Sequence, residues 1–121
     1  MGKDAQVLER HRLRTRPKIR SSIVAMSKLF PAPAKVLDVG SEDGYANEVF
    51  AELGYDVVST DVRPLGPKVI RDDIMNTKLS VGFDIVYGRH VLEHVKPTKR
   101  FLRKCFRLLK KRWTCFFCFS T

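Results

Sequence analysis

Short apolar runs alternate with stretches of helical periodicity after residue 34, and this alternation constrains the fold more than any other feature of the chain. The runs cover residues 35–39, 55–61, 68–73, 83–88 and 113–121. One helical pattern follows the first run and another, with Thr98 as a candidate N-cap, precedes the last. The apolar stripes of these two patterns are Ala46, Val49, Phe50 and Leu53, and Phe101, Leu102, Cys105, Leu108 and Leu109. Strands that alternate with helices predict an α/β sandwich around a mostly parallel sheet.

The chain before residue 34 has a different character. Residues 5–14 have a weak and very basic helical pattern, and Pro17 is expected to begin a second helix. That second helix would carry Ile19, Ile23, Met26 and Phe30 on one face, and "PAPA" would end it. We therefore expect a basic helical arm over residues 1–33 and an α/β domain over residues 34–121.

Charge is distributed unevenly along the chain. The net charge of +10 divides into +7 over residues 1–35, −6 over residues 36–95 and +9 over residues 96–121. Basic flanks of this kind can meet a nucleic acid or an acidic partner, here through residues 10–20 and 96–112. The alternative is that the cations form solvated helix faces.

Targeting signals and cysteine pairs are not evident in the sequence. No apolar run approaches the roughly 18 residues that span a membrane, and the N-terminus lacks the apolar segment of a signal peptide. We therefore expect a soluble cytoplasmic protein that does not bind a membrane. The pair Cys115 and Cys118 lies in a strand-like run, where positions three apart point to opposite faces, so neither a metal nor a redox site is expected.

Polar residues and glycines follow four of the predicted strands. They are Asp38 to Gly44, Asp61, Asp72 with Asp73, and Gly88 to His90. Parallel α/β sheets bind ligands beyond the carboxyl ends of their strands, so these residues are expected to form one site. The alternative is that they are loop residues and helix caps, which is equally plausible for Asp43.

Taken in order, these segments resemble the class I S-adenosylmethionine-dependent methyltransferases, in the subgroup with a "VLEHV" segment. The resemblance rests on "VLDVGSEDGY", "VVSTD" with its acid 23 residues after Asp38, "IRDDI", "FDIVYGRHVLEHV" and "FLRKCFRLLK". It implies S-adenosylmethionine as cofactor and methyl transfer to an unidentified acceptor. It also implies a Rossmann-like three-layer sandwich of about five strands in the order 3-2-1-4-5, here without the usual terminal antiparallel strand pair.

The resemblance assigns cofactor contacts at the four strand ends. Asp61 would accept both ribose hydroxyls, Gly40 and Gly44 would let the backbone approach closely, and Asp38 would act through water or by fixing the loop. The remaining contacts are Ser41 and Val62, Asp73 at the adenine amine with Ile74 on the ring, and Gly88 with Arg89 at the methionyl tail. The glycines do not form the G-x-G-x-x-G of nicotinamide-binding loops, and the acids of the loop disfavour a pyrophosphate.

A general base is needed only for some acceptors, and His90 is the preferred candidate. The alternative is that "HVLEHV" begins a structural helix, and a further alternative is a non-catalytic module that binds its partner through the basic flanks.

Three departures from the family pattern carry consequences. Glu42 replaces the middle glycine, which costs on the order of 1 kcal/mol if that position needs a positive φ. The sequence "KKRW" stands where Pro-Gly-Gly usually precedes strand five. The chain ends after strand five, so we expect a minimal or truncated enzyme, or a domain completed by a partner, and a homo-oligomer could cover the strand-five edge.

Overall fold

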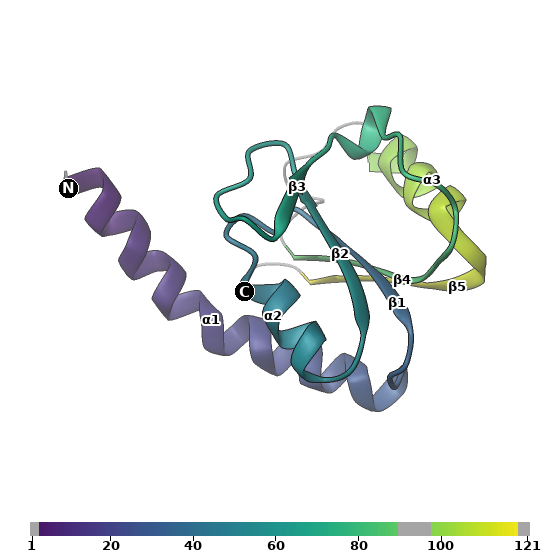
Figure 1. The fold of residues 1–121 in the computed structure, drawn as a ribbon, viewed down its shortest axis with the longest axis horizontal. Coiled ribbons are helices and arrows are strands. Elements are labelled where there is room, and N and C mark those ends of the chain that lie inside the picture. The colour runs from purple at the N-terminus through teal and green to yellow at the C-terminus, as the bar shows by residue number, and fades with distance from the viewer. Residues whose placement is uncertain (1–2, 90–97, 119–121) are drawn as a thin grey trace.

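The computed structural model describes residues 3–89 and 98–118, which contain a parallel sheet of five strands (Figure 1). The strands are β1 Lys35–Val39, β2 Asp56–Asp61, β3 Val69–Arg71, β4 Phe83–Arg89 and β5 Leu109–Cys118. Their order in the sheet is β3-β2-β1-β4-β5, and every neighbouring pair is parallel. The predicted fold class and strand order are therefore confirmed.

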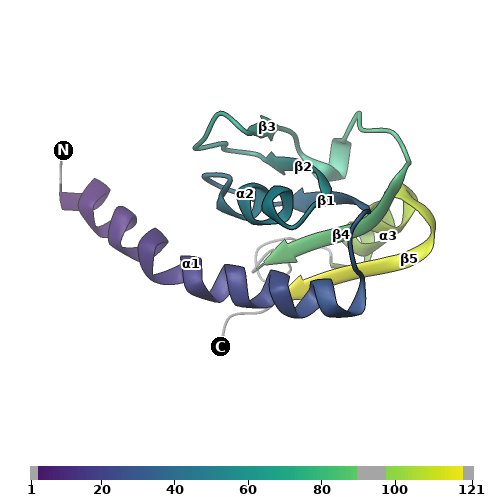
Figure 2. The same cartoon turned by 60° about the horizontal axis from the view of Figure 1, so that its bottom comes forward.

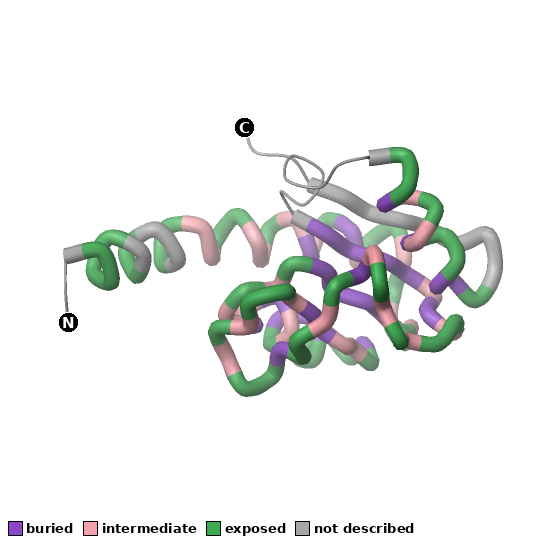
Figure 3. The backbone as a smooth tube through the Cα atoms, turned by 90° about the horizontal axis from the view of Figure 1, so that it is seen from above, coloured by how far each residue is buried: buried purple, intermediate pink, exposed green. Residues whose placement is uncertain are grey.

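Helices cover both faces of the sheet. On one face α1 (Lys3–Leu29) and α2 (Tyr45–Glu52) pack against Val36 and Ile85, whereas α3 (Thr98–Leu108) and the short 3-10 helix η1 (Ile74–Asn76) pack against Leu37 and Val86 on the other. Successive strand residues point to opposite faces, so the central strands must be apolar on both sides. In Figure 3 the central strands are the buried part of the chain and the helices are more exposed, as the predicted three-layer sandwich requires.

Helix α1 differs from its prediction. It is a single helix that continues through Pro17, whereas the sequence predicted a second helix beginning there. Proline removes one backbone donor, so the helix continues with one hydrogen bond fewer in the turn before Pro17. Arg16 and Arg20, in the turn around Pro17, both lie against the ring of Tyr45 in α2. The predicted apolar row is confirmed, because Ile23 and Met26 are fully buried.

Helix α1 also reaches beyond the sheet. Its C-terminal half packs on the domain, while its N-terminal half continues past the ends of β4 and β5 and is mostly exposed (Figures 2 and 3). Among the described helices, none combines the length and apolar character needed to cross a bilayer.

The connection between β2 and β3 is short for a parallel pair. Parallel strands are usually joined by a dozen residues or more, yet here residues 62–68 suffice and contain no helix. The reason is that β3 pairs only with the last three residues of β2, from Ser59 opposite Val69 to Asp61 opposite Arg71. Residues 62–67 therefore remain at the edge where the strands end.

Strand β5 begins earlier than the sequence predicted. The sequence predicts Leu109 on the apolar stripe of a helix and a strand only from residue 113, but α3 ends at Leu108 and β5 starts directly after it at Leu109. The buried side chain of Leu109 belongs to the core under the sheet, so the chain enters the sheet without a loop. Phe83 pairs with Leu109 and Ile85 with Thr114, so the extra residues of β5 are taken up by an irregularity at "KKRW".

Candidate functional site

The loop after β1, residues 40–44, lies where three strands end side by side. Val39 at the end of β1 pairs with Thr60 in β2 and with Gly88 in β4. The backbone N–H groups of Gly40 and Ser41 both donate to the carbonyl of Thr60, at 2.9 and 3.0 Å. The predicted glycine loop is thus tied to the residue before Asp61, and the strand-end residues do meet at one edge.

Asp61 is held in a fixed orientation by two backbone donors. The N–H of Glu42 donates to Oδ2 at 2.9 Å, and the N–H of Arg63 donates to Oδ1 at 2.8 Å. A carboxylate offers about four acceptor positions, so each oxygen keeps one for a further donor. The carboxylate is only half-buried, which leaves it accessible to a ligand that presents two hydroxyl groups.

The 40–44 loop uses left-handed backbone conformations at three of its five residues. Gly40 and Gly44 have φ of 73° and 88°, which glycine adopts readily, and Glu42 has φ of 54°. The concern about Glu42 is therefore justified, since a left-handed conformation costs a residue with a Cβ about 1–2 kcal/mol. Two hydrogen bonds hold it there, because its N–H binds Asp61 and its carbonyl accepts from the N–H of Leu65 at 2.9 Å.

Residues 62–67 lie directly on the 40–44 loop. Besides the bond from Leu65 to Glu42, Gly66 approaches the backbone so closely that a Cβ there would lie 2.3 Å from the Asp43 carbonyl oxygen. Only glycine fits such a contact. No local sequence pattern indicated that residues 62–67 support the 40–44 loop.

Asp38 is buried beneath the 40–44 loop. Its Oδ2 accepts from the Ser59 hydroxyl at 2.8 Å, and that hydroxyl accepts from the Asn47 side chain in α2 at 3.0 Å. Burial raises the pKa of Asp38 to about 6, while the hydroxyls of Ser41 and Ser59 lower it and the charge of Asp61 raises it further. Asp38 thus links β1, β2 and α2 under the loop.

The end of β3 supplies two acids with different surroundings. Asp73 is exposed and caps η1, since its Oδ1 accepts from the N–H of Met75 at 3.0 Å. Its neighbour Asp72, which donates from its N–H to the carbonyl of Asp61 at 3.1 Å, has a buried Oδ2 without a hydrogen-bond partner in the described structure. The sequence placed Asp72 at this edge but assigned it no cofactor contact, and its orphaned acceptor beside Asp61 makes it a further candidate for one.

The other predicted contacts differ in accessibility. Ile74 is buried and Val62 is 56% exposed, so Val62 offers the larger apolar surface at this edge. Gly88 is buried at the end of β4. The side chain of Arg89, and His90 with the rest of "HVLEHV", lie outside the described residues, as do the side chains of Cys115 and Cys118.

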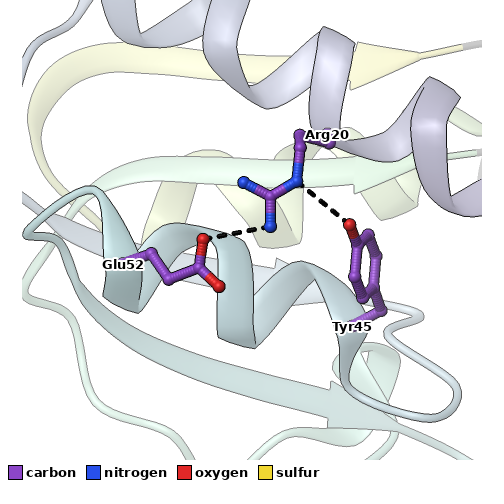
Figure 4. A network of polar contacts seen from close by, with 3 residues as sticks. All are labelled: Arg20, Tyr45 and Glu52. Atoms are coloured by element: carbon purple, nitrogen blue, oxygen red, sulfur yellow. Dashed lines mark hydrogen bonds and ion pairs between the residues drawn. The ribbon is translucent and has the colours of Figure 1, made fainter.

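Arg16 and Arg20 of α1 contact α2 next to the 40–44 loop. Figure 4 shows Arg20 reaching both Tyr45, the first residue of α2, and Glu52, its last. Arg20 donates from Nε to the Tyr45 hydroxyl at 3.1 Å and from its terminal nitrogen to Glu52 at 3.0 Å. The guanidinium carbon of Arg16 lies 5.0 Å from the centre of the Tyr45 ring. A terminal nitrogen of Arg16 forms an ion pair with the Asp43 carboxylate at 3.5 Å. Helix α1 is therefore attached to the loop itself, which the sequence did not indicate.

The chain resembles a known family and several known proteins. Residues 10–120 match a family described as "Methyltransferase domain". The ubiquinone biosynthesis O-methyltransferase of Xanthomonas axonopodis pv. citri is 33% identical over 100 residues, which cover 69% of this chain and 42% of that protein. The mitochondrial ubiquinone biosynthesis O-methyltransferase of Schizosaccharomyces pombe is 31% identical over 94 residues, covering 64% of this chain and 33% of the relative.

Solved structures share the fold. A SAM-dependent methyltransferase from Archaeoglobus fulgidus superposes with a TM-score of 0.72 at 20% identity, covering 91% of this chain and 56% of that one. Phosphoethanolamine N-methyltransferase 2 of Haemonchus contortus, crystallised with S-adenosyl-L-methionine, gives 0.66 at 19% identity over 80% of this chain and 27% of its own. The chain spans less than half the length of the relatives that its sequence matches.

Proposed function

Because the chain belongs to the methyltransferase domain family whose model it matches, we propose that it binds S-adenosylmethionine and transfers the methyl group to an acceptor. The observation that carries this proposal is the Asp61 carboxylate, which two backbone N–H groups orient while one acceptor position on each oxygen stays free. Two adjacent hydroxyls of a ribose match that arrangement. When bound, the cofactor supplies a methyl group already activated by a sulfonium.

The residues around Asp61 then have distinct tasks. The 40–44 loop and the contacts of residues 62–67 fix its position, and Asp38 acts by holding that loop from below. Asp73, with Asp72 beside it, offers acceptors for an exocyclic amine, and Val62 or Ile74 an apolar surface for a ring. Gly88 and Arg89 are assigned to the methionyl tail, and Ser41 to the loop. The acids of this edge suit a cationic ligand.

The experiment is calorimetry of the protein with S-adenosylhomocysteine. Asp61→Ala should weaken binding at least tenfold, since it removes two charge-assisted hydrogen bonds. The matched control is Asp56→Ala, which removes an exposed aspartate at the opposite end of the same strand and should leave affinity unchanged. Folded wild-type protein that does not bind, or equal affinities for the two variants, would refute the assignment.

The catalytic assignment depends on the acceptor. His90 is the proposed general base, to be used only if the acceptor must lose a proton. His90→Gln should lower turnover and remove a rate dependence near the histidine pKa, without changing S-adenosylhomocysteine affinity. Turnover that survives with the same pH profile would exclude His90 from this role.

A second candidate function is binding of a nucleic acid or an acidic partner through the basic flanks. It is favoured by the exposed cations of α1, among them Arg10, Arg14 and Lys18, and by those of α3. We also propose that a second copy of the chain covers the edge of β5, because β5 is an outer strand of the sheet. Light scattering that gives the monomer mass of 13.9 kDa would exclude this self-association.

A further inference from the structure

The charged residues on the outward face of α3 are all cations. Helix α3 contains no acidic residue, and its apolar side chains Phe101, Cys105 and Leu108 are buried in the core. The opposite face must therefore point to solvent. It consists of the exposed Lys99, Arg100, Arg103 and Arg107 and the half-buried Lys104.

This arrangement opposes the stability of the helix. Like charges at spacings of three and four residues repel, and the face contains several such pairs, including Lys99 with Arg103 and Arg103 with Arg107. Lys99 and Arg100 also lie in the first turn, where the helix dipole disfavours positive charge. Within the described part of the chain no acidic side chain forms an ion pair with any of these cations, in contrast to Arg16 and Arg20 of α1. An anionic partner would relieve this repulsion.

An aromatic ring lies at the border of the cationic face. Phe106 is 55% exposed, although the other aromatic residue of α3, Phe101, is fully buried. Helical geometry places Phe106 one turn from Arg103, and Lys99 lies one turn further along the same side of the helix. Proteins that bind single-stranded nucleic acids combine cations for the backbone with exposed aromatic rings on which bases stack.

We propose that the cationic face of α3, with Phe106 at its border, binds single-stranded nucleic acid. Arginine, which supplies three of the five cations, matches the geometry of phosphate through paired N–H donors. A membrane surface fits less well, because the apolar face of α3 is used in the core and Phe106 alone offers little area for insertion. This inference narrows the second candidate function to one surface, the cationic face of α3, and to one class of partner, single-stranded nucleic acid. It does not depend on methyl transfer.

The chain provides a matched control on another surface. Arg10 and Arg14 are exposed cations four residues apart on α1, as Arg103 and Arg107 are on α3. Helices α1 and α3 pack on opposite faces of the sheet, so the two pairs do not share one surface. Replacing either pair by glutamine changes the net charge equally, and all four side chains are exposed, so neither double variant should unfold the domain.

The test is fluorescence anisotropy of a labelled oligouridylate of about twelve nucleotides, titrated with the full chain without cofactor. Arg103→Gln with Arg107→Gln should weaken binding at least tenfold and reduce the salt slope by about 1.4, or 0.7 per lost contact. Arg10→Gln with Arg14→Gln should weaken it less than threefold. Phe106→Ala should cost at least fivefold, with an unchanged circular dichroism spectrum.

Several outcomes would overturn the proposal. Equal losses in the two double variants would show that net charge alone drives binding. Affinity that does not fall with added salt, or tighter binding of a duplex of the same length, would exclude a single-strand site on this face. Binding to phosphatidylcholine–phosphatidylglycerol vesicles that needs Phe106, without oligouridylate binding, would assign the face to a membrane instead.

Discussion

Replacing Glu42 by glycine should stabilise the protein. Glu42 has φ of 54°, a conformation that costs a residue with a Cβ about 1–2 kcal/mol. Glycine removes this cost but loses about 0.5–1 kcal/mol through the greater freedom of the unfolded chain. Both hydrogen bonds of residue 42 use backbone atoms, so the substitution keeps them. The net expectation is a gain of about 0.5–1 kcal/mol in the free energy of unfolding.

The assay is thermal and urea unfolding followed by circular dichroism. With an unfolding entropy of about 2.1 cal/mol/K per residue over 121 residues, this gain raises Tm by about 2–4 °C. The control is Glu42→Ala, which removes the same charge and retains the backbone cost, so its Tm should change by less than about 1 °C. An equal rise in both variants would show that the charge, rather than the backbone, is responsible. No rise in the glycine variant would refute the strain argument.

Three further predictions concern the surroundings of the 40–44 loop. Gly66→Ala should weaken S-adenosylhomocysteine binding at least tenfold by calorimetry, because its Cβ would lie 2.3 Å from a backbone carbonyl oxygen; unchanged affinity would mean that residues 62–67 do not support the loop. Burial raises the folded-state pKa of Asp38 to about 6, so ionisation of Asp38 lowers the stability of the wild type as pH rises from about 4 to 6. In urea unfolding, the stability of Asp38→Asn relative to the wild type should therefore increase over that pH range and then stay constant, and a difference that does not vary with pH would contradict this. Tyr45→Phe should lower the free energy of unfolding by about 1 kcal/mol, more than Glu52→Gln, because the hydrogen bond from Arg20 to the Tyr45 hydroxyl is less exposed than the one from Arg20 to Glu52. A larger loss in Glu52→Gln would show that Glu52 contributes more than Tyr45 to holding α1 on α2.

The sequence predicted the sheet well because its signals were local. The runs that became β1 and β4 carry apolar residues for both faces of the sheet, and the stripe from Ala46 to Leu53 occurs at helical spacing. The common edge at which the candidate site residues lie followed from the rule that parallel strands end together. The sequence alone was therefore enough to predict that Asp61 lies close to the 40–44 loop.

What the sequence did not reveal depends on contacts between distant residues. The contacts of Arg16 and Arg20 with Tyr45 join α1 to a residue at least 25 positions further along the chain, and no local pattern indicates them. The contact of Gly66 with Asp43 depends on the register of β3 against β2, and no local sequence pattern encodes that register. Leu108 and Leu109 are both buried in the core, and a single apolar residue fits a helical pattern as well as a strand pattern. The sequence therefore could not show that α3 ends at Leu108 and β5 begins at Leu109.

The direct junction of α3 and β5 has a consequence for local unfolding. Leu108 ends the helix and Leu109 begins the strand, both are buried, and no linker between them can absorb movement of one relative to the other. Helix and edge strand should therefore open as a single cooperative unit, with similar amide hydrogen-exchange protection. Since β5 pairs with β4 as far as Gly88 and Arg89, a ligand that slows the opening of α3 would also slow exchange at the end of β4, beside the candidate site.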